Sequence, residues 1–202
     1  MNSKREEIIQ KVRELYSRYG IRSVTMDDVV REVGISKKTL YQYFNDKSAL
    51  VSAVIKCDAA IKMEDHDNAL EGASNAIEMM LAFYDFQARM IRDYNPSLIY
   101  DLKKYYPEVH NDFLEAKREM IYENILSNLI RGKSEGLYRE DLQEEVIAML
   151  NLLRVEAFIN SAVVKAEEVL TGEFFKEMFK YHMYGIVSEK GRKILEQNID
   201  KL

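Results

Sequence analysis

Polar and basic residues between positions 25 and 47 have the types and spacing that contact with nucleic acid requires. Lysine donates hydrogen bonds to guanine and to phosphate, and a threonine methyl group packs against the methyl group of thymine. Tyrosine hydroxyls, and lysines at helix starts, suit phosphate contacts that set position along DNA rather than base identity. We therefore predict base contacts from Lys37, Lys38 and Thr39, and backbone contacts from Thr25, Met26, Tyr41, Tyr43 and Lys47.

Two short helices joined by a tight turn are predicted to position these side chains. Thr25 is a good N-cap residue, and Asp28 follows three positions later, where a carboxylate favours a helix N-terminus. Gly34 ends the first helix in a left-handed conformation that glycine adopts at little cost. Ser36 can cap the second helix. The residues assigned to the core of this helix-turn-helix are Val29, Val33, Leu40 and Phe44.

The stretch closely resembles the DNA-binding signature of the tetracycline-repressor (TetR) family. The resemblance covers roughly residues 5–60 and rests on Thr25, Gly34-Ile35-Ser36, Thr39-Leu40-Tyr41-x-Tyr43-Phe44 and Lys47. The remainder of the chain matches that family only in length, helicity and helix order. The resemblance implies a nine-helix homodimeric regulator with one DNA-binding head per subunit. It also implies a ligand cavity in each C-terminal domain and dimerisation through the last two long helices.

Composition indicates an all-helical chain without a membrane segment. The 202 residues include only two prolines and eight glycines, with 47% hydrophobic and 31% charged residues. No uncharged apolar run reaches the about eighteen residues that a membrane span needs. The N-terminus leads into an amphipathic helix rather than a signal peptide, and the single Cys57 fits a reducing cytoplasm. We therefore expect a cytoplasmic protein with no membrane partner.

Charge is distributed unevenly along the chain. Residues 1–50 contain ten Lys/Arg and seven Asp/Glu, a net charge of +3, whereas the remaining residues carry −8. A basic head on an acidic body fits a small DNA-contacting module attached to a larger domain.

Apolar periodicity predicts nine helices and no strand. The helix after the helix-turn-helix is expected to fade in the polar run 64–68, and the next helix is predicted over 69–94. A later helix is predicted to start with a capping box at Asp141 and Glu144 and to end near residue 164, and one last helix carries residues as far as Leu195. The predicted domains are a DNA-binding domain over 1–50, with the fourth helix to about residue 66 as connector, and a helical effector-binding and dimerisation domain over 51–202.

The predicted C-terminal domain is rich in Tyr, Phe and Met, which build adaptable apolar cavities. Core packing is the ordinary role of such residues at helical spacing. Arg154 and Glu156 stand out because they interrupt the most apolar helix, where a buried charge requires a partner. They serve a ligand, a structural ion pair or a polar edge of a dimer interface. The candidate ligand-binding residues are Phe83, Tyr84, Phe86, Met90, Tyr100, Phe113, Met120, Arg154 and Glu156.

A dimer interface is expected where helices carry apolar stripes on two sides, one for the subunit and one for its partner. The candidates are Ile147, Leu150, Leu153, Phe158, Phe175, Phe179, Met183 and Ile186.

No catalytic, metal or cofactor site is predicted. His66 lies among acidic residues, but consecutive residues at a helix end point in different directions, so we interpret this run as a solvated linker. His110 and His182 are isolated in the sequence, and the chain has no CxxC motif and no Gly-rich phosphate loop.

The leading hypothesis is a sequence-specific DNA-binding regulator, a repressor released from a palindromic operator by a small lipophilic or aromatic effector. Its partners are then double-stranded operator DNA, a second copy of the chain and the effector. One alternative is a regulator without a small-molecule effector, controlled by a protein partner. A more remote alternative is an enzyme or an interaction module.

Overall fold

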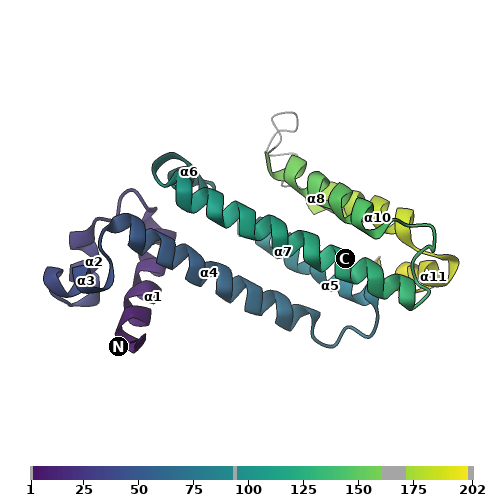
Figure 1. Cartoon of the computed structure of the whole chain (residues 1–202), viewed down its shortest axis with the longest axis horizontal. Coiled ribbons are helices and arrows are strands. Elements are labelled where there is room, and N and C mark those ends of the chain that lie inside the picture. Colours follow the sequence, from purple (N-terminus) through teal and green to yellow (C-terminus); the bar gives the residue numbers. More distant parts are fainter. Residues whose placement is uncertain (1, 93–94, 161–171, 200–202) are drawn as a thin grey trace. The chain divides into compact units, whose positions relative to one another are not determined.

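The computed structural model describes residues 2–92, 95–160 and 172–199, and this part of the chain forms ten helices and no strand (Figure 1). The predicted all-α fold class is confirmed. None of the described helices is long and apolar enough to cross a bilayer. The helices are α1 Asn2–Tyr19, α2 Met26–Val33, α3 Lys37–Tyr43, α4 Lys47–Leu70, α5 Ala76–Arg92, α6 Pro96–Tyr105, α7 Pro107–Ser134, α8 Glu144–Asn160, α10 Gly172–Ile186 and α11 Glu189–Asn198.

The chain divides into two compact units. The first unit consists of Met1–Asp65 and Asn95–Ala116, and the second of His66–Tyr94 and Lys117–Leu202. The long helices α4 and α7 therefore contribute residues to both units. The predicted division near residue 50 separates the chain into two consecutive stretches of sequence. The order of residues alone does not reveal that α6 packs with the N-terminal helices.

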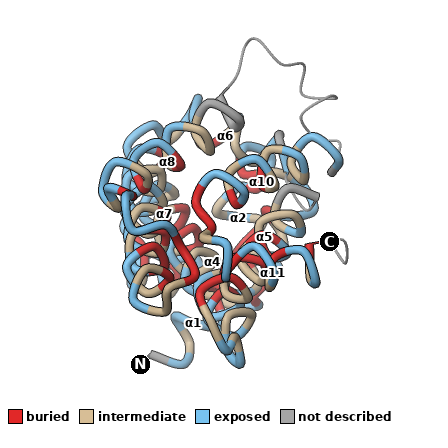
Figure 2. The backbone as a smooth tube through the Cα atoms, turned by 90° about the vertical axis from the view of Figure 1, so that its right-hand side faces the viewer, coloured by how far each residue is buried: buried red, intermediate tan, exposed pale blue. Residues whose placement is uncertain are grey.

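The core of the first unit is formed by α1 to α4 together with α6. Leu102 of α6 is buried among residues of the N-terminal helices. The neighbouring Asp101 accepts a hydrogen bond from the Arg22 backbone N–H at 2.9 Å. Figure 2 shows that the helices carry buried segments beside exposed ones, as amphipathic helices do. The buried apolar residues include Ile8, Val12, Tyr16, Ile21, Val24, Val29, Val33, Leu40, Phe44, Leu50, Val51 and Val54.

The core of the second unit brings together α5, α7, α8, α10 and α11. A buried polar network lies within it, because the Tyr138 hydroxyl donates to Asn128 Oδ1 at 2.8 Å and Asn128 Nδ2 donates to the Ala76 carbonyl at 2.9 Å. Gly132 is required beside the Tyr138 ring, since a Cβ atom at this position would overlap the ring. The buried apolar residues include Ile77, Met80, Leu81, Tyr84, Ile121, Ile125, Leu129, Ala148, Phe179, Met183, Ile186 and Leu195.

The predicted junction between the fourth and fifth helices is wrong. Helix α4 continues through the polar run to Leu70, and α5 starts only at Ala76. His66 supplies an inward-facing side chain within that run, so the helix retains a buried face. The break comes at Gly72, whose φ of 91° ends helical geometry, and the Asn75 side chain accepts from the first amides of α5.

The helix count of nine is also wrong, because the predicted last helix is two helices. The chain leaves α10 at Val187, which pairs with Tyr138 in an isolated antiparallel bridge. Ser188 then caps α11, accepting a hydrogen bond from the Gly191 N–H at 3.1 Å. A Cβ atom on Gly191 would overlap the Leu137 carbonyl oxygen, so a residue with a side chain cannot pack there without a shift.

The start of α8 differs from the predicted capping box. The helix begins at Glu144. Asp141 forms an ion pair with Arg139 at 3.0 Å instead of capping, and Glu144 pairs with Lys133 at 2.9 Å. The predicted end of this helix near residue 164 lies outside the described residues.

Candidate nucleic-acid interface

A capping box fixes the start of α2. The Thr25 hydroxyl accepts from the Asp28 N–H at 3.2 Å, and the Asp28 carboxylate accepts from the Thr25 N–H at 2.8 Å. The Thr25 hydroxyl also donates to that carboxylate at 2.6 Å, and Arg31 forms an ion pair with it. These hydrogen bonds to Thr25, with the charge of Arg31, lower the pKa of Asp28 to about 2. The predicted N-terminus of this helix is therefore confirmed.

The turn between α2 and α3 also follows the prediction. Gly34 has φ 72° and ψ 39°, and its N–H donates to the Val30 carbonyl at 3.0 Å. Ser36 caps α3 by accepting from the Thr39 N–H at 3.0 Å, and the two hydroxyl oxygens lie 2.7 Å apart. The Thr39 hydroxyl is thus bonded within the protein, and its methyl group is suited to a thymine contact.

Buried residues hold α3 against the rest of the first unit. Leu40 and Phe44 of this segment are 0% and 2% exposed, and Val29 and Val33 face them from α2. Arg5 covers the Phe44 ring, with its guanidinium carbon 5.3 Å from the ring centroid. The core positions predicted from sequence are confirmed, and they leave the opposite face of α3 to solvent.

The exposed face of α3 carries Lys37, Lys38, Tyr41 and Gln42. Among the described residues no ion pair involves Lys38. Gln42 was not among the predicted contact residues. A glutamine side chain can nevertheless bind adenine with two hydrogen bonds, in which its amide oxygen accepts from N6 and its amide nitrogen donates to N7. Its i+4 relation to Lys38 puts both on one face of the helix, and this spacing is the signal that identifies it.

Lys37 has a partner that sequence reasoning missed. Its ammonium lies 2.9 Å from Asp27 Oδ1, and this ion pair raises the pKa of Lys37. Both side chains are exposed, so the pair contributes little to stability. The Lys37 ammonium keeps two further N–H donors for DNA, while Asp27 restrains its position.

Lys47 is more enclosed than predicted. Its ammonium donates to the carbonyl oxygens of Ile21 at 2.7 Å and Arg22 at 3.3 Å, in the connection between α1 and α2. Partial burial lowers its pKa. An ammonium has three N–H donors, so one remains for phosphate. Lys47 thus supports the head in the free protein in addition to its predicted DNA contact.

The other predicted contact residues differ in exposure. Thr25 and Tyr41 are exposed, whereas Met26 and Tyr43 are half-buried and pack against the core of the first unit. The packing of Tyr43 leaves only part of its side chain accessible to DNA.

The candidate ligand residues are divided between the two units. Tyr84 stacks on Phe175 with ring centroids 5.0 Å apart, inside the core of the second unit. Met90 and Met120 are half-buried. Tyr100 and Phe113 belong to the first unit, where Phe113 packs against the core and Tyr100 is exposed. The rings of Phe83 and Phe86 both contact the ring of His66 edge-on, with ring centroids 5.6 and 5.4 Å from the His66 centroid.

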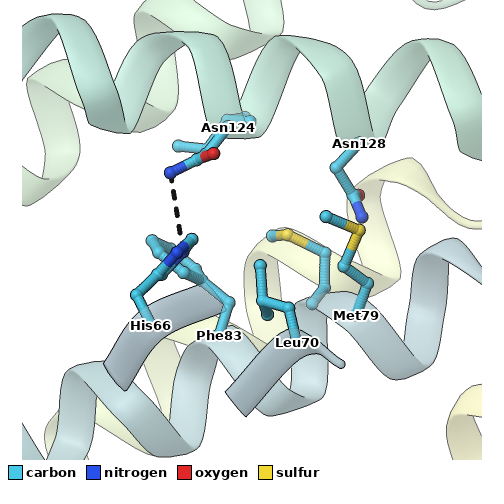
Figure 3. A pocket seen from close by; sticks show the side chains of 8 residues that line it. His66, Leu70, Met79, Phe83, Asn124 and Asn128 are labelled. Atoms are coloured by element: carbon cyan, nitrogen blue, oxygen red, sulfur yellow. Dashed lines mark hydrogen bonds between the residues drawn. The ribbon is translucent and has the colours of Figure 1, made fainter. Parts of the chain in front are cut away.

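The prediction that His66 belongs to a solvated linker is wrong, because the residue is only 2% exposed. It borders a small cavity of about 10 Å³ together with Leu70, Met79, Phe83, Asn124 and Asn128, contributed by α4, α5 and α7 (Figure 3). The linker prediction failed because burial of His66 depends on helices that are distant in sequence. At this cavity the buried polar side chain of His66 lies beside space within the second unit.

Arg154 and Glu156 have separate surroundings. Glu156 forms an ion pair with Arg118. Arg154 donates to the Met178 carbonyl at 2.6 Å and bonds the Asn151 side chain, while its Nε has no partner among the described residues. Burial lowers the pKa of Arg154 to about 10, which keeps it charged at pH 7. Glu156 thus fits the ion-pair alternative.

The candidate interface residues fall into two groups. Leu150 and Leu153 of α8 are 56% and 53% exposed, and Val146 and Met149 beside them are exposed as well. On α10, by contrast, Phe179, Met183 and Ile186 are buried in the subunit's own core, Phe175 is half-buried, and so is Ile147 of α8. The apolar residues exposed on α10 are Phe174, Tyr181 and Tyr184. The side chain of Phe158 lies outside what the structure describes.

Within the described ranges no cluster of three or more metal-ligating side chains occurs. His110 and His182 do not form a catalytic pair with any described residue. The Nε2 atom of His182 is buried without a hydrogen-bond partner in this part of the chain, and burial with the nearby Arg154 charge lowers its pKa to about 3.

Residues 8–54 match the family model of bacterial regulatory proteins, tetR family. The HTH-type transcriptional repressor KstR2 of Mycolicibacterium smegmatis is 22% identical over 148 residues, 72% of each chain. The nucleoid occlusion factor SlmA of Vibrio campbellii is 25% identical over 173 residues, 80% of this chain and 84% of that protein. A transcriptional regulator of Cytophaga hutchinsonii has the same fold, with a TM-score of 0.76 and 19% identity over 91% of this chain and 98% of that one.

Proposed function

Since this chain is a DNA-binding transcriptional regulator that belongs to the bacterial tetR family, we propose that it is a homodimeric repressor released from a palindromic operator by a small lipophilic or aromatic effector. Its family is one of regulators rather than enzymes. The related KstR2 protein is a transcriptional repressor, which supports the direction of control. The cytoplasm is the proposed location, because the operator is there.

The observation that carries this proposal is the surface of α3. Lys37, Lys38 and Gln42 are exposed on a helix whose opposite face is buried and whose two ends are fixed by caps. A rigid helix that presents cationic and amide groups is suited to the major groove, where both kinds of group distinguish base pairs.

Dimerisation is supported by the exposed apolar residues of α8. Val146, Met149, Leu150 and Leu153 recur at spacings of three and four, so they form one continuous stripe on the helix. A stripe of this kind on a single chain marks a protein interface. Two heads related by a two-fold axis then address two half-sites, which predicts a palindromic operator.

Effector control is supported by the residues at the two ends of α4. Its first residue, Lys47, bonds the connection that precedes α2, and its last turns carry His66 and Leu70 beside the cavity. A ligand that has a higher affinity for one conformation of α4 than for another shifts the equilibrium toward that conformation. Because α4 begins in the DNA-binding head, such a shift can change DNA affinity.

Selection of DNA from a random library by the purified dimer tests the regulator proposal. We expect the enriched sequences to share a near-palindrome, which binds more tightly than random DNA in a fluorescence titration and loses affinity steeply as salt rises. A dimeric preparation without preference for any palindrome would contradict the proposal.

A second candidate is a regulator controlled by a protein partner without a small effector. The observation that favours it is the size of the cavity beside His66, whose volume of about 10 Å³ corresponds to one water molecule. Repeating the DNA titration with candidate effectors separates the two candidates, since only effector control changes the DNA affinity.

A further inference from the structure

The cavity beside His66 continues toward the surface of the second unit. Four of its lining residues, His66, Leu70, Met79 and Asn124, also line an open depression of about 510 Å³, which Asp67, Asn68 and Glu71 complete. The open volume is in the range of small-molecule sites. The depression therefore has an acidic, polar outer part and an apolar inner end.

The hydrogen bonds of His66 determine what the inner end offers to a ligand. The Nδ1 atom lies 3.0 Å from Asp67 Oδ1, and a carboxylate only accepts, so Nδ1 carries the proton. The other ring nitrogen, Nε2, then presents a lone pair. It lies 3.5 Å from Asn124 Nδ2, at the long limit of a hydrogen bond, as the dashed line in Figure 3 shows.

Asn124 presents a second acceptor. Its amide nitrogen faces His66, and its amide oxygen has no hydrogen-bond donor among the described residues. Asn128 is engaged at both ends of its amide, because its oxygen accepts from the Tyr138 hydroxyl and one of its N–H groups donates to the Ala76 carbonyl. The cavity thus offers two hydrogen-bond acceptors, Nε2 of His66 and the amide oxygen of Asn124, to a ligand that donates.

The charged residues that line the depression also favour a ligand that donates hydrogen bonds. Asp67 and Glu71 line the depression, and none of its lining residues is Lys or Arg. The Arg131 guanidinium lies 3.8 Å from Met79 Sδ and is paired with Glu135 at 2.7 Å. A carboxylate or phosphate ligand would be repelled here, whereas an ammonium is attracted.

The inner wall suits an apolar substituent on that ligand. Met79, Met80, Leu70 and Phe83 line it. Methionine side chains are flexible and change rotamer at little cost, so they can turn aside to admit an alkyl or aryl group. The Phe83 ring adds a face that attracts cations.

We propose that this site binds a small lipophilic amine in its ammonium form. The ammonium replaces Asn124 Nδ2 as the donor to Nε2 of His66 and also donates to the amide oxygen of Asn124. Asp67 and Glu71 supply the opposite charge, and the hydrocarbon part packs against Met79 and Phe83. The inference rests on the proposed effector control, to which it adds the chemical class of the ligand.

Isothermal titration calorimetry of the full chain with hexylamine, hexanol and hexanoate at pH 7 tests the proposal. The three probes share one hydrocarbon chain and differ in charge. We expect hexylamine to bind at one site per chain, and hexanoate to bind at least about tenfold more weakly, the equivalent of about 1.4 kcal/mol. Equal or tighter binding of hexanoate would overturn the proposal.

Two pairs of substitutions locate the site. Asp67→Asn with Glu71→Gln is expected to weaken hexylamine about tenfold or more and to leave hexanol unchanged. The matched control, Glu140→Gln with Glu189→Gln, removes the same charge from exposed positions outside the depression and is expected to change neither. His66→Leu removes the ring acceptor and is expected to weaken hexylamine similarly. If the two double variants weaken hexylamine equally, the amine binds the acidic surface in general and the site is refuted.

DNA affinity is a separate readout. Hexylamine that binds with these dependences but leaves operator affinity unchanged refutes effector control and leaves the amine site standing. Intact operator binding without any hexylamine binding refutes the amine site and leaves the regulator standing.

Discussion

The surface of α3 and the surface of α8 differ in the chemistry that they expose. Helix α3 presents Lys37 and Lys38 with polar neighbours, and α8 presents a stripe that includes Leu150 and Leu153. The DNA contact that we propose for the first surface acts through charges that salt screens, so its affinity is expected to depend steeply on ionic strength. The dimer contact that we propose for the second acts through removal of apolar area from water, which salt hardly weakens.

This difference separates the two associations of the protein. Raising salt is expected to release DNA while the dimer persists. Substitutions on the two surfaces are therefore expected to have distinct effects on dimerisation and on DNA affinity.

The largest effect is expected from Leu150→Glu with Leu153→Glu. Two buried, unpaired carboxylates in an interface cost several kcal/mol, so the dimer dissociates and operator affinity falls by roughly a hundredfold or more. Analytical ultracentrifugation with a DNA titration measures both. The control is Met63→Glu, which charges an exposed apolar residue outside the stripe and is expected to leave the dimer intact. A variant that stays dimeric would show that another surface pairs the subunits.

Removing the lysines of α3 comes next. Lys37→Ala with Lys38→Ala is expected to weaken operator binding by about 1–3 kcal/mol for each lysine that binds a base, and to reduce the preference over random DNA. The dimer should be unaffected. The matched control, Lys103→Ala with Lys193→Ala, removes two exposed lysines elsewhere. A decrease in affinity that is equal for operator and random DNA would assign both lysines to phosphate rather than to bases.

Lys47→Ala is expected to act on both stability and binding. The carbonyl oxygens of Ile21 and Arg22 lose their donor, which destabilises the head by about 1 kcal/mol, since the site is partly solvated. DNA affinity should fall about equally on all sequences, with a salt slope smaller by about one. Urea denaturation and titrations at two salt concentrations measure these effects. A decrease confined to the operator would contradict the phosphate role.

The smallest effect is expected at the capping box of Thr25 and Asp28, which fixes the start of α2. The folded-state pKa of Asp28 is lowered to about 2, so its contribution is present above the usual pKa of 3.8 and is lost as pH falls toward 2. Asp28→Asn should therefore lower Tm at pH 7, and its difference from the unchanged protein should shrink as pH drops below 4. A difference that stays constant down to pH 3 would show that the charge of Asp28 does not contribute.

The parts predicted correctly from sequence are those specified by neighbours in the chain. Thr25 and Asp28 are three residues apart, Gly34 acts through its own φ, and Ser36 caps the helix that follows it directly. Such interactions need no distant partner, so the residue types and their spacing are sufficient to identify them.

The parts that were missed depend on distant contacts. Lys47 bonds carbonyl oxygens 25 and 26 positions away. His66 stands in a polar run, yet its burial is decided by Phe83, Phe86 and Asn124 on other helices. Periodicity in one segment cannot report the packing of another.

By itself the sequence determined an all-α chain whose head has two capped helices joined at Gly34, and which residues of that head face inward. Local hydrogen bonds and apolar spacing suffice for this, since both are written within a few residues. Only the tertiary structure decided that His66 borders a cavity, that the last predicted helix breaks at Ser188, and that the exposed apolar stripe of α8 also includes Val146 and Met149. Each of these depends on which helices pack together, and packing joins residues that lie far apart in the chain.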